Sequence, residues 1–179
     1  TGVMVAAGCG AVITLLLSVA PEERLRGMLF WLMGDFSQGV NPTYALIGMV
    51  GIGLLTAPLA RDLNVLIRGN DTAKALGVSV SFVRIAVYLL ASMATAVSVT
   101  TAGSVGFVGL VIPHLTRMFV GNDQRILLPT SMLAGGIFLV LADTLARLLI
   151  APQQLPVGVV TALIGVPVFL YLLNRTRYQ

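Results

Sequence analysis

The chain has 179 residues, of which 57% are hydrophobic and only 10% charged, and its formal net charge is +4. Soluble domains carry about 25% charged residues. A chain with a mean hydropathy of +0.96 therefore exposes apolar surface to lipid, which excludes an ordinary soluble domain. The basic residues are scattered singly, without aromatic interleaving, which argues against nucleic acid as a partner. Cys9 is the single cysteine and is interpreted as a small packing residue, with no internal disulfide or cysteine-based metal site.

The chain opens on Thr1-Gly2-Val3, without an initiator methionine and without the basic segment of a signal peptide. We therefore expect a piece of a longer membrane protein. A membrane-spanning helix needs about 20 mostly apolar residues. Segments of this kind are predicted at 2–20, 44–60, 82–102, 127–150 and 156–173.

Residues 25–36 are too few to span. Their tryptophan, Trp31, suits the headgroup level, so an interfacial helix is predicted there. Residues 61–84 are polar and predicted to form a loop in water. Within this loop Asp71 is expected to cap a short helix over 72–76 that Gly77 ends, and Ser79 or Ser81 to cap the next helix.

Residues 105–118 offer only about a dozen apolar residues and include Pro113-His114, and the distribution of charge decides their placement. If they cross the membrane, one side holds eight basic residues and the other three; if they do not, the split is five against six. The crossing arrangement is predicted, with the 61–84 loop and the C-terminus in the cytoplasm. The eight are Arg61, Arg68, Lys74, Arg84, Arg117, Arg125, Arg175 and Arg177, and the three are Arg24, Arg26 and Arg147.

Residues that carry enzyme chemistry are not found in a workable pattern. His114 is the single histidine and has no partner for a metal site. Gly103, Gly106 and Gly109 recur every third residue, which predicts a small face for close helix packing. We therefore expect no catalytic residues, no metal and no cofactor bound by this chain.

Asp143 and Arg147 lie four residues apart, so they share one face of a helix. Twenty residues of helix place Arg147 about 30 Å from Leu127, near the external surface. Two interpretations remain open: an internal ion pair with Arg147 reaching outward, or an external contact for an acidic partner. The 61–84 loop is likewise either a solvated linker or, because Ala73, Leu76 and Val78 are apolar, a docking site for a protein.

Six runs of the chain together carry a family resemblance. They are FWLMG (30–34), GNDTAKALGV (69–78), GSVGFVGLVIPH (103–114), LP (128–129), AD with AR (142–147) and LPVGVVT (155–161). These runs resemble the permease subunits of ABC importers for iron–siderophores, haem and cobalamin, the FecCD-type or type II importers. The resemblance implies an all-α membrane bundle of about ten spans per subunit. This chain would be a single transmembrane permease domain over 1–179 that supplies the last six crossings.

The resemblance also implies three sets of site residues. Arg147 matches an external arginine that meets an acidic residue of the binding protein. The first span matches a helix lining the translocation path, through Gly2, Ala6, Ala7, Gly8, Gly10 and Ala11. The segment that docks on the ATPase subunit matches Gly69, Asn70, Asp71, Thr72, Ala73, Lys74, Ala75, Leu76 and Gly77.

The expected activity is inward movement of a metal chelate across the bacterial inner membrane. ATP is expected on a partner, because this chain has no Gly-x-x-x-x-Gly-Lys loop. The expected partners are an ATP-binding cassette subunit, a periplasmic or surface binding protein, a second permease subunit and the lipid bilayer. The alternatives are a polytopic membrane enzyme, which needs paired reactive groups in the bilayer, and a self-contained channel, which needs no docking loop.

Overall fold

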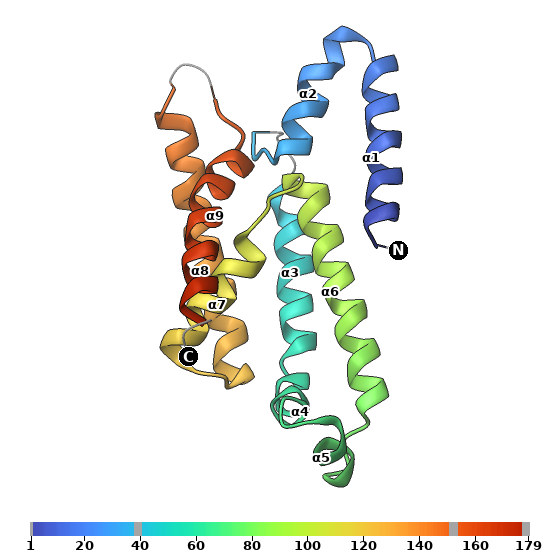
Figure 1. The fold of residues 1–179 in the computed structure, drawn as a ribbon, viewed down its shortest axis with the longest axis vertical. Helices are drawn as coiled ribbons and strands as arrows, with labels where there is room; N and C mark the ends of the chain where they lie inside the picture. The colour runs from blue at the N-terminus through green and yellow to red at the C-terminus, as the bar shows by residue number, and fades with distance from the viewer. Residues whose placement is uncertain (1, 38–40, 151–153, 177–179) are drawn as a thin grey trace.

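The computed structural model describes residues 2–37, 41–150 and 154–176, and these residues form α-helices joined by short turns. The all-α prediction is confirmed for this part of the chain. Figure 1 shows the helices as an elongated bundle. In order they are α1 (Gly2–Val19), α2 (Glu22–Met33), α3 (Pro42–Thr56), α4 (Leu59–Leu66), α5 (Asn70–Ala75), α6 (Val80–Ala102), α7 (Val108–Val120), α8 (Gln124–Leu148) and α9 (Val157–Thr176).

The bundle has two ends, named here for the helices that lie at them. The α5 end, at the bottom of Figure 1, holds α4, α5, the start of α6 and the turn from α7 to α8. The α2 end, at the top, holds α2, the end of α6, the end of α8 and the start of α9. Helix α3 packs against α6, while α8 packs against both α7 and α9. Helix α1 stands beside α2 and carries no buried residue.

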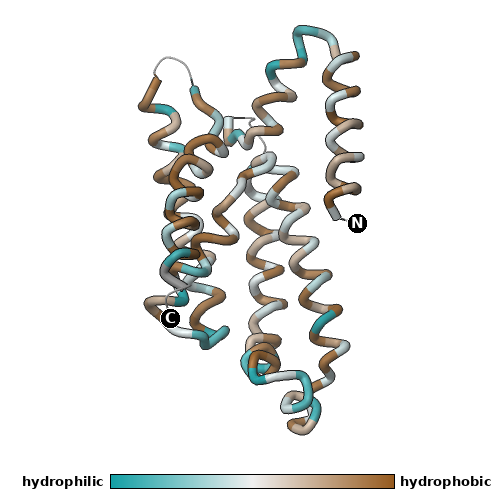
Figure 2. The backbone as a smooth tube through the Cα atoms, in the orientation of Figure 1, coloured by the Kyte–Doolittle hydropathy of each residue, from teal (hydrophilic) through white to brown (hydrophobic). Residues whose placement is uncertain are grey.

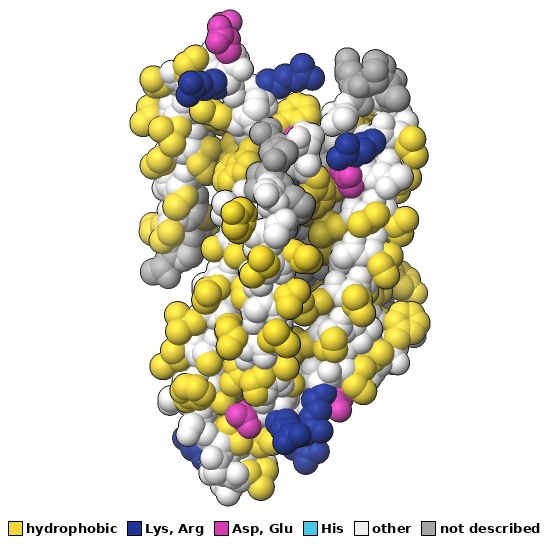
Figure 3. Space-filling model, turned by 180° about the vertical axis from the view of Figure 1, so that it is seen from behind, with side chains coloured by type: hydrophobic (Ala, Val, Ile, Leu, Met, Phe, Trp, Pro, Cys, Tyr) yellow, Lys and Arg dark blue, Asp and Glu magenta, His cyan; other side chains and the backbone are white. Residues whose placement is uncertain are grey.

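Hydropathy follows this division into two ends. Apolar residues cover the middle of the bundle, whereas the strongly polar residues gather near the two ends (Figure 2). The basic side chains also lie at the two ends in the view of Figure 3. The α5 end carries Arg61, Arg68, Lys74, Arg84, Arg117 and Arg125, and the α2 end carries Arg24, Arg26 and Arg147.

Among the described residues, four helices are long and apolar enough to cross a membrane, namely α1, α6, α8 and α9. The pair α3 and α4 would make a fifth span with a 56° bend. Helix α7 has 13 residues and falls short of the length of a span. Length and composition thus support four or five of the six predicted crossings.

The sixth crossing concerns the segment that contains α7, and contacts fix both of its ends. At the start, the Ser104 hydroxyl donates to the Leu32 carbonyl at the α2 end. Past the other end, the Asp123 carboxylate accepts a hydrogen bond from Asn64 of α4 at the α5 end. An extended stretch over 103–107 adds to the short helix. The segment therefore runs from one end of the bundle to the other, as the charge split predicts.

Two predicted boundaries around the 61–84 loop are wrong. The second span was expected to run to residue 60, but α3 ends at Thr56 and the chain bends before α4 begins at Leu59. The loop was expected to start at Arg61, yet Arg61 lies inside α4. The polar residues of α4 are compatible with a helix because it is amphipathic: Ala60 is buried while Arg61 is exposed.

The glycine run after α6 does not form the predicted helical packing face. Gly103 ends α6 with a φ of +69°, and a Cβ there would lie 2.1 Å from the Trp31 carbonyl oxygen. A Cβ added at Gly106 or Gly109 would meet no atom of another segment within 4 Å. The prediction of close packing is therefore correct for Gly103, where the end of α6 lies against α2. It is wrong for Gly106 and Gly109 within the described chain.

Small residues do form a buried contact between α8 and α9. Ala142 and Ala146 of α8 and Val157 and Val160 of α9 make one buried cluster. Alanine lets two helix backbones approach closely in a membrane, where close van der Waals packing stabilises helix pairs. This cluster sets the position of the last turn of α8, which carries Arg147.

Candidate coupling and docking sites

The segment from α4 to α5 is held by backbone geometry that glycine supplies. After α4 the chain turns at Gly69, with a φ of +116°, and it turns again after α5 at Gly77, with a φ of +80°. Such positive φ values are readily adopted only by glycine. Ala73, in the middle of α5, is fully buried, and its carbonyl accepts a 2.9 Å hydrogen bond from the Val78 amide. The segment is thus a small, folded unit.

The predicted helix in this segment exists, with different ends. It runs over Asn70–Ala75 and its N-cap is Gly69, which makes no side-chain cap hydrogen bond. Asp71 was predicted as the cap; it lies instead in the first helical turn. The next helix begins at Val80 after Ser79, which also makes no side-chain cap hydrogen bond. The prediction that Gly77 ends the short helix is confirmed.

Two large apolar side chains project from this unit. Leu76 is 64% exposed and Ile67 is 58% exposed, with the charged residues Arg68 and Lys74 exposed beside them. The predicted apolar face of Ala73, Leu76 and Val78 is therefore only partly correct, because Ala73 faces inward. The sequence analysis did not identify Ile67 as part of this exposed apolar surface. Its position just after an amphipathic helix and before a glycine turn could have indicated it. Exposed apolar residues that gather on a surface mark interaction sites for proteins or membranes.

The same end of the bundle contains a polar link between α4 and α8. The Asn64 side-chain nitrogen Nδ2 donates a 2.7 Å hydrogen bond to Asp123 Oδ1. Asn64 Oδ1 accepts a 2.8 Å hydrogen bond from the backbone amide of Gln124. Asp123 is the N-cap of α8, and its Oδ1 also accepts from the Arg125 amide at 3.0 Å. Sequence reasoning missed Asn64, because 60 positions separate it from Gln124. We call Asn64, Asp123 and Gln124 the Asn64 clamp.

At the opposite end, Asp143 and Arg147 form the predicted pair on α8. Arg147 Nε lies 2.8 Å from Asp143 Oδ2, and the side chains are 45% and 27% exposed for Arg147 and Asp143 respectively. Ala142 and Ala146, their neighbours in sequence, point the other way into the α8–α9 cluster. The pair is thus fixed on a rigid helix and remains open to solvent or to a partner.

The end of α2 meets the start of α9 with almost no space between the backbones. A Cβ on Gly158 would lie 1.8 Å from the Met33 carbonyl oxygen, so only glycine fits there. The Gly158 amide donates to the Gly34 carbonyl at 3.4 Å, and the Asp35 amide donates to the Ala102 carbonyl at 3.0 Å. This junction, formed by Gly34, Gly103 and Gly158, was not predicted from the sequence as a contact between α2, α6 and α9.

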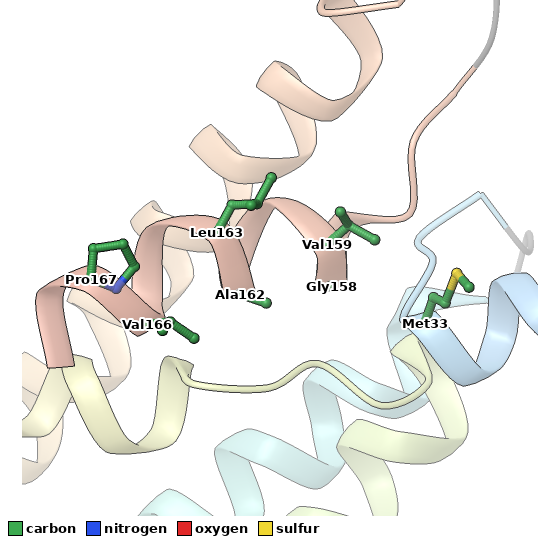
Figure 4. Close-up of a pocket in the computed structure, with 7 residues that line it drawn as sticks. All are labelled: Met33, Gly158, Val159, Ala162, Leu163, Val166 and Pro167. Carbon is green, nitrogen blue, oxygen red and sulfur yellow. The ribbon is translucent and has the colours of Figure 1, made fainter. Parts of the chain in front are cut away.

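Below this junction α9 presents an apolar groove of about 540 Å³, which Figure 4 shows with Met33 at one end. The groove carries no charged side chain and no hydroxyl, so it offers mainly apolar contact. It is lined by Met33, Gly158, Val159, Ala162, Leu163, Val166 and Pro167.

The small residues expected to line a path lie on α1, away from the sites above. In the second half of α1, Ile13, Leu16 and Leu17 share an apolar cavity with α2. The structure brings the predicted path residues together with no other helix that it describes, so their role stays a prediction. Those residues are Gly2, Ala6, Ala7, Gly8, Gly10 and Ala11, and all are exposed.

Within the described ranges, no group of three or more His, Cys, Asp or Glu side chains could hold a metal ion. The described arrangement offers a folded polar unit with exposed apolar side chains at one end of the bundle and an exposed charged pair at the other.

The comparisons with known proteins agree with this architecture. Residues 1–175 match the FecCD transport family. The chain is 39% identical over 183 residues to the hemin transport system permease protein HmuU of Yersinia pestis, covering 99% of this chain and 54% of the relative. It is 45% identical over 177 residues to the cobalamin import system permease protein BtuC of Halobacterium salinarum, covering 97% and 47%.

A solved structure described as an inward-facing conformation of a metal-chelate type ABC transporter is also similar. It superposes with a TM-score of 0.87 at 36% sequence identity, over 96% of this chain and 57% of that one. The chain thus belongs to the FecCD transport family, whose members found here are transport permeases. It spans about half the length of these relatives.

Proposed function

We propose that this chain is part of the permease subunit of an ABC importer that moves a metal chelate inward. The chelate is an iron–siderophore, haem or a cobalamin, and a separate ATPase subunit supplies the driving force. The single observation that carries the proposal is the folded α4–α5 unit, which presents Leu76 and Ile67 among charged residues. A self-contained channel has no use for such a surface, and a metal-dependent intramembrane enzyme needs a cluster of metal ligands, which the described residues do not form.

The proposal places the α5 end in the cytoplasm of a bacterial cell, at the inner membrane, with the C-terminus on the same side. Among the basic residues whose side chains are described, six lie at this end and three at the other, which agrees with the excess of Lys and Arg in cytoplasmic loops. The ATPase subunit then meets α5, and the periplasmic or surface binding protein meets Arg147. A second permease subunit covers the apolar surfaces of α1 and α9.

The test is a charge placed on the exposed apolar side chains. Burial of a leucine contributes roughly 1.5–3 kcal/mol. Leu76→Asp, and separately Ile67→Asp, should therefore weaken binding of the ATPase subunit by about tenfold or more. Binding is measured on purified permease in nanodiscs, together with ATP hydrolysis and uptake of cyanocobalamin or haem in proteoliposomes.

The control is Asn122→Asp, which adds the same charge at the same end but outside the α4–α5 unit, on an exposed residue. It should bind the ATPase subunit like the unmodified chain. Normal ATPase binding and uptake in both Leu76→Asp and Ile67→Asp would show that the α4–α5 unit is only a linker.

A further inference from the structure

The Asn64 clamp joins two helices that serve different ends of the molecule. Helix α4 leads into α5 through a short turn, so Asn64 belongs to the same folded unit as Leu76. Helix α8 has 25 residues and rises about 37 Å along the bundle, with Asp123 at its start and Arg147 in its last turn. The Asn64 clamp therefore lies where the α4–α5 unit contacts α8, the helix that extends to the α2 end of the bundle.

Within the described part of the chain, the clamp provides the side-chain hydrogen bonds between α4 and α8. Beside it, between the α3–α4 bend and the start of α8, lies a largely apolar cavity of about 450 Å³. Gly53, Ala57, Leu128 and Pro129 are among the residues that line it. A helix that borders a cavity on one side can shift, and the two hydrogen bonds of Asn64 link the movement of α4 to that of α8.

We propose that Asn64 is a positioning residue that couples the α4–α5 unit to α8. A displacement of the α4–α5 unit is passed through Asp123 and Gln124 to α8, and along α8 to Asp143 and Arg147. This inference rests on the proposed function, since it assigns the Asn64 clamp a part in linking ATP hydrolysis to transport.

The geometry allows a sharp exchange experiment. In Asn64→Asp two carboxylates face each other, and the donor to Asp123 is lost. In the double variant Asn64→Asp with Asp123→Asn, the new amide at 123 donates to the new carboxylate at 64. That carboxylate still accepts from the Gln124 backbone amide. The Arg125 backbone amide loses its acceptor, because in the parent it bonds the same oxygen, Asp123 Oδ1, as Asn64 does. The exchange thus retains the two hydrogen bonds between the side chain at 64 and the start of α8 while reversing which partner is charged.

The measurement uses the assembled importer, with ATPase subunit and binding protein, in proteoliposomes, and counts cyanocobalamin or haem transported per ATP hydrolysed. Asn64→Asp should lower this ratio about fivefold to tenfold, since a hydrogen bond to a charged group is lost. The exchange should restore it to within about twofold. Asp123→Asn alone keeps an acceptor for Asn64 and should have a small effect.

A second readout does not depend on transport. Cysteines replacing Arg61 and Asn122, both exposed, carry spin labels in a Cys9→Ser background. The distance distribution between the labels should be narrow in the parent, broad in Asn64→Asp and narrow again in the exchange.

Three results would overturn the proposal. One is an unchanged transport ratio and label distance in Asn64→Asp. Another is an exchange variant as defective as the single one. The third is a loss of transport that only follows the amount of assembled complex. If the unmodified chain binds no ATPase subunit, the proposed function fails together with the inference. If Leu76→Asp uncouples and Asn64→Asp does not, only the inference about Asn64 fails.

Discussion

Arg147 donates a 2.8 Å hydrogen bond from Nε to Oδ2 of Asp143, one turn earlier on α8. This bond uses Nε of the guanidinium, so the two Nη atoms remain available to a partner. The Arg147 side chain is 45% exposed. Arginine can grip a carboxylate with two parallel bonds, which lysine does less well. The bond to Asp143 thus orients the Arg147 side chain while leaving its two Nη atoms free to bind a carboxylate.

Arg147→Glu should weaken binding of the soluble binding protein. The new carboxylate is repelled by Asp143 and by an acidic partner, and the loss should be larger at low salt than at high salt because exposed charges are screened. Binding is measured by surface plasmon resonance on the permease in nanodiscs. Arg147→Lys is the matched control and should lose less. A lower yield of folded protein with unchanged affinity would instead show a purely structural role.

The segment containing α7 should cross the membrane although α7 itself has only 13 residues. Single cysteines replacing Gly106 and Asn122, both exposed, flank α7 in a Cys9→Ser background. A membrane-impermeant maleimide added to intact cells should label position 106 and leave position 122 unlabelled until the membrane is opened. Labelling of both positions from the outside would exclude the six-crossing arrangement.

Gly158→Ala should strongly destabilise the protein, because its Cβ would overlap the Met33 carbonyl oxygen at 1.8 Å. Overpacking of this kind costs about 1–3 kcal/mol and more when backbone must move. The measurement is the midpoint of thermal unfolding in detergent. Gly109→Ala is the control: it lies in α7 with no atom within 4 Å of the added Cβ, so its midpoint should be unchanged or slightly higher. Equal unfolding midpoints for Gly158→Ala and Gly109→Ala would show that the close contact between Gly158 and Met33 is absent.

Thr116 and Ser131 link α7 to α8 through hydroxyls 2.8 Å apart. Side-chain hydrogen bonds between membrane helices contribute about 0.6 kcal/mol on average and up to about 1.7 kcal/mol. Thr116→Val and Ser131→Ala should each destabilise the bundle by about 1 kcal/mol, and the double variant by less than their sum. Unfolding in mixed micelles measures the four states of this cycle. Strictly additive losses would show that the two hydroxyls do not interact.

The Asn64 clamp should be insensitive to pH near neutrality. The hydrogen bond from Asn64, with help from the Arg125 amide, lowers the pKa of the Asp123 carboxyl below its ordinary value. A carboxyl with a depressed pKa contributes stability above its unfolded pKa and loses it as the pH falls through the folded pKa. The label distance between positions 61 and 122 should therefore be the same at about pH 8 and about pH 5. A broader distance distribution at about pH 5 would contradict the expectation that the Asp123 carboxylate stays ionised there.

The sequence predicts the spans well because apolar runs and charge asymmetry are local properties. Helices α6, α8 and α9 begin and end within about three residues of the predicted limits. The Asp143–Arg147 pair was also predictable, since a spacing of four residues fixes a shared helix face.

The contacts between distant segments could not be read from the sequence in this way. Asn64 and Asp123 become neighbours only when α7 has returned to the α5 end, and Gly158 meets Met33 only when α9 starts beside α2. The end of the second span was missed for a related reason. The helix resumes at Leu59 after the bend and carries on through Arg61, so polarity marked the level of the membrane surface rather than the end of the helix.

Helix α1 has no buried residue, and this has a consequence for assembly. A membrane helix satisfies its own backbone hydrogen bonds, so α1 is stable in lipid without neighbours. Because the described chain packs little against it, rotating or tilting α1 about its link to α2 disturbs few contacts. The orientation of α1 in the assembled protein therefore depends on the surface that packs against it, more than on the helices described here.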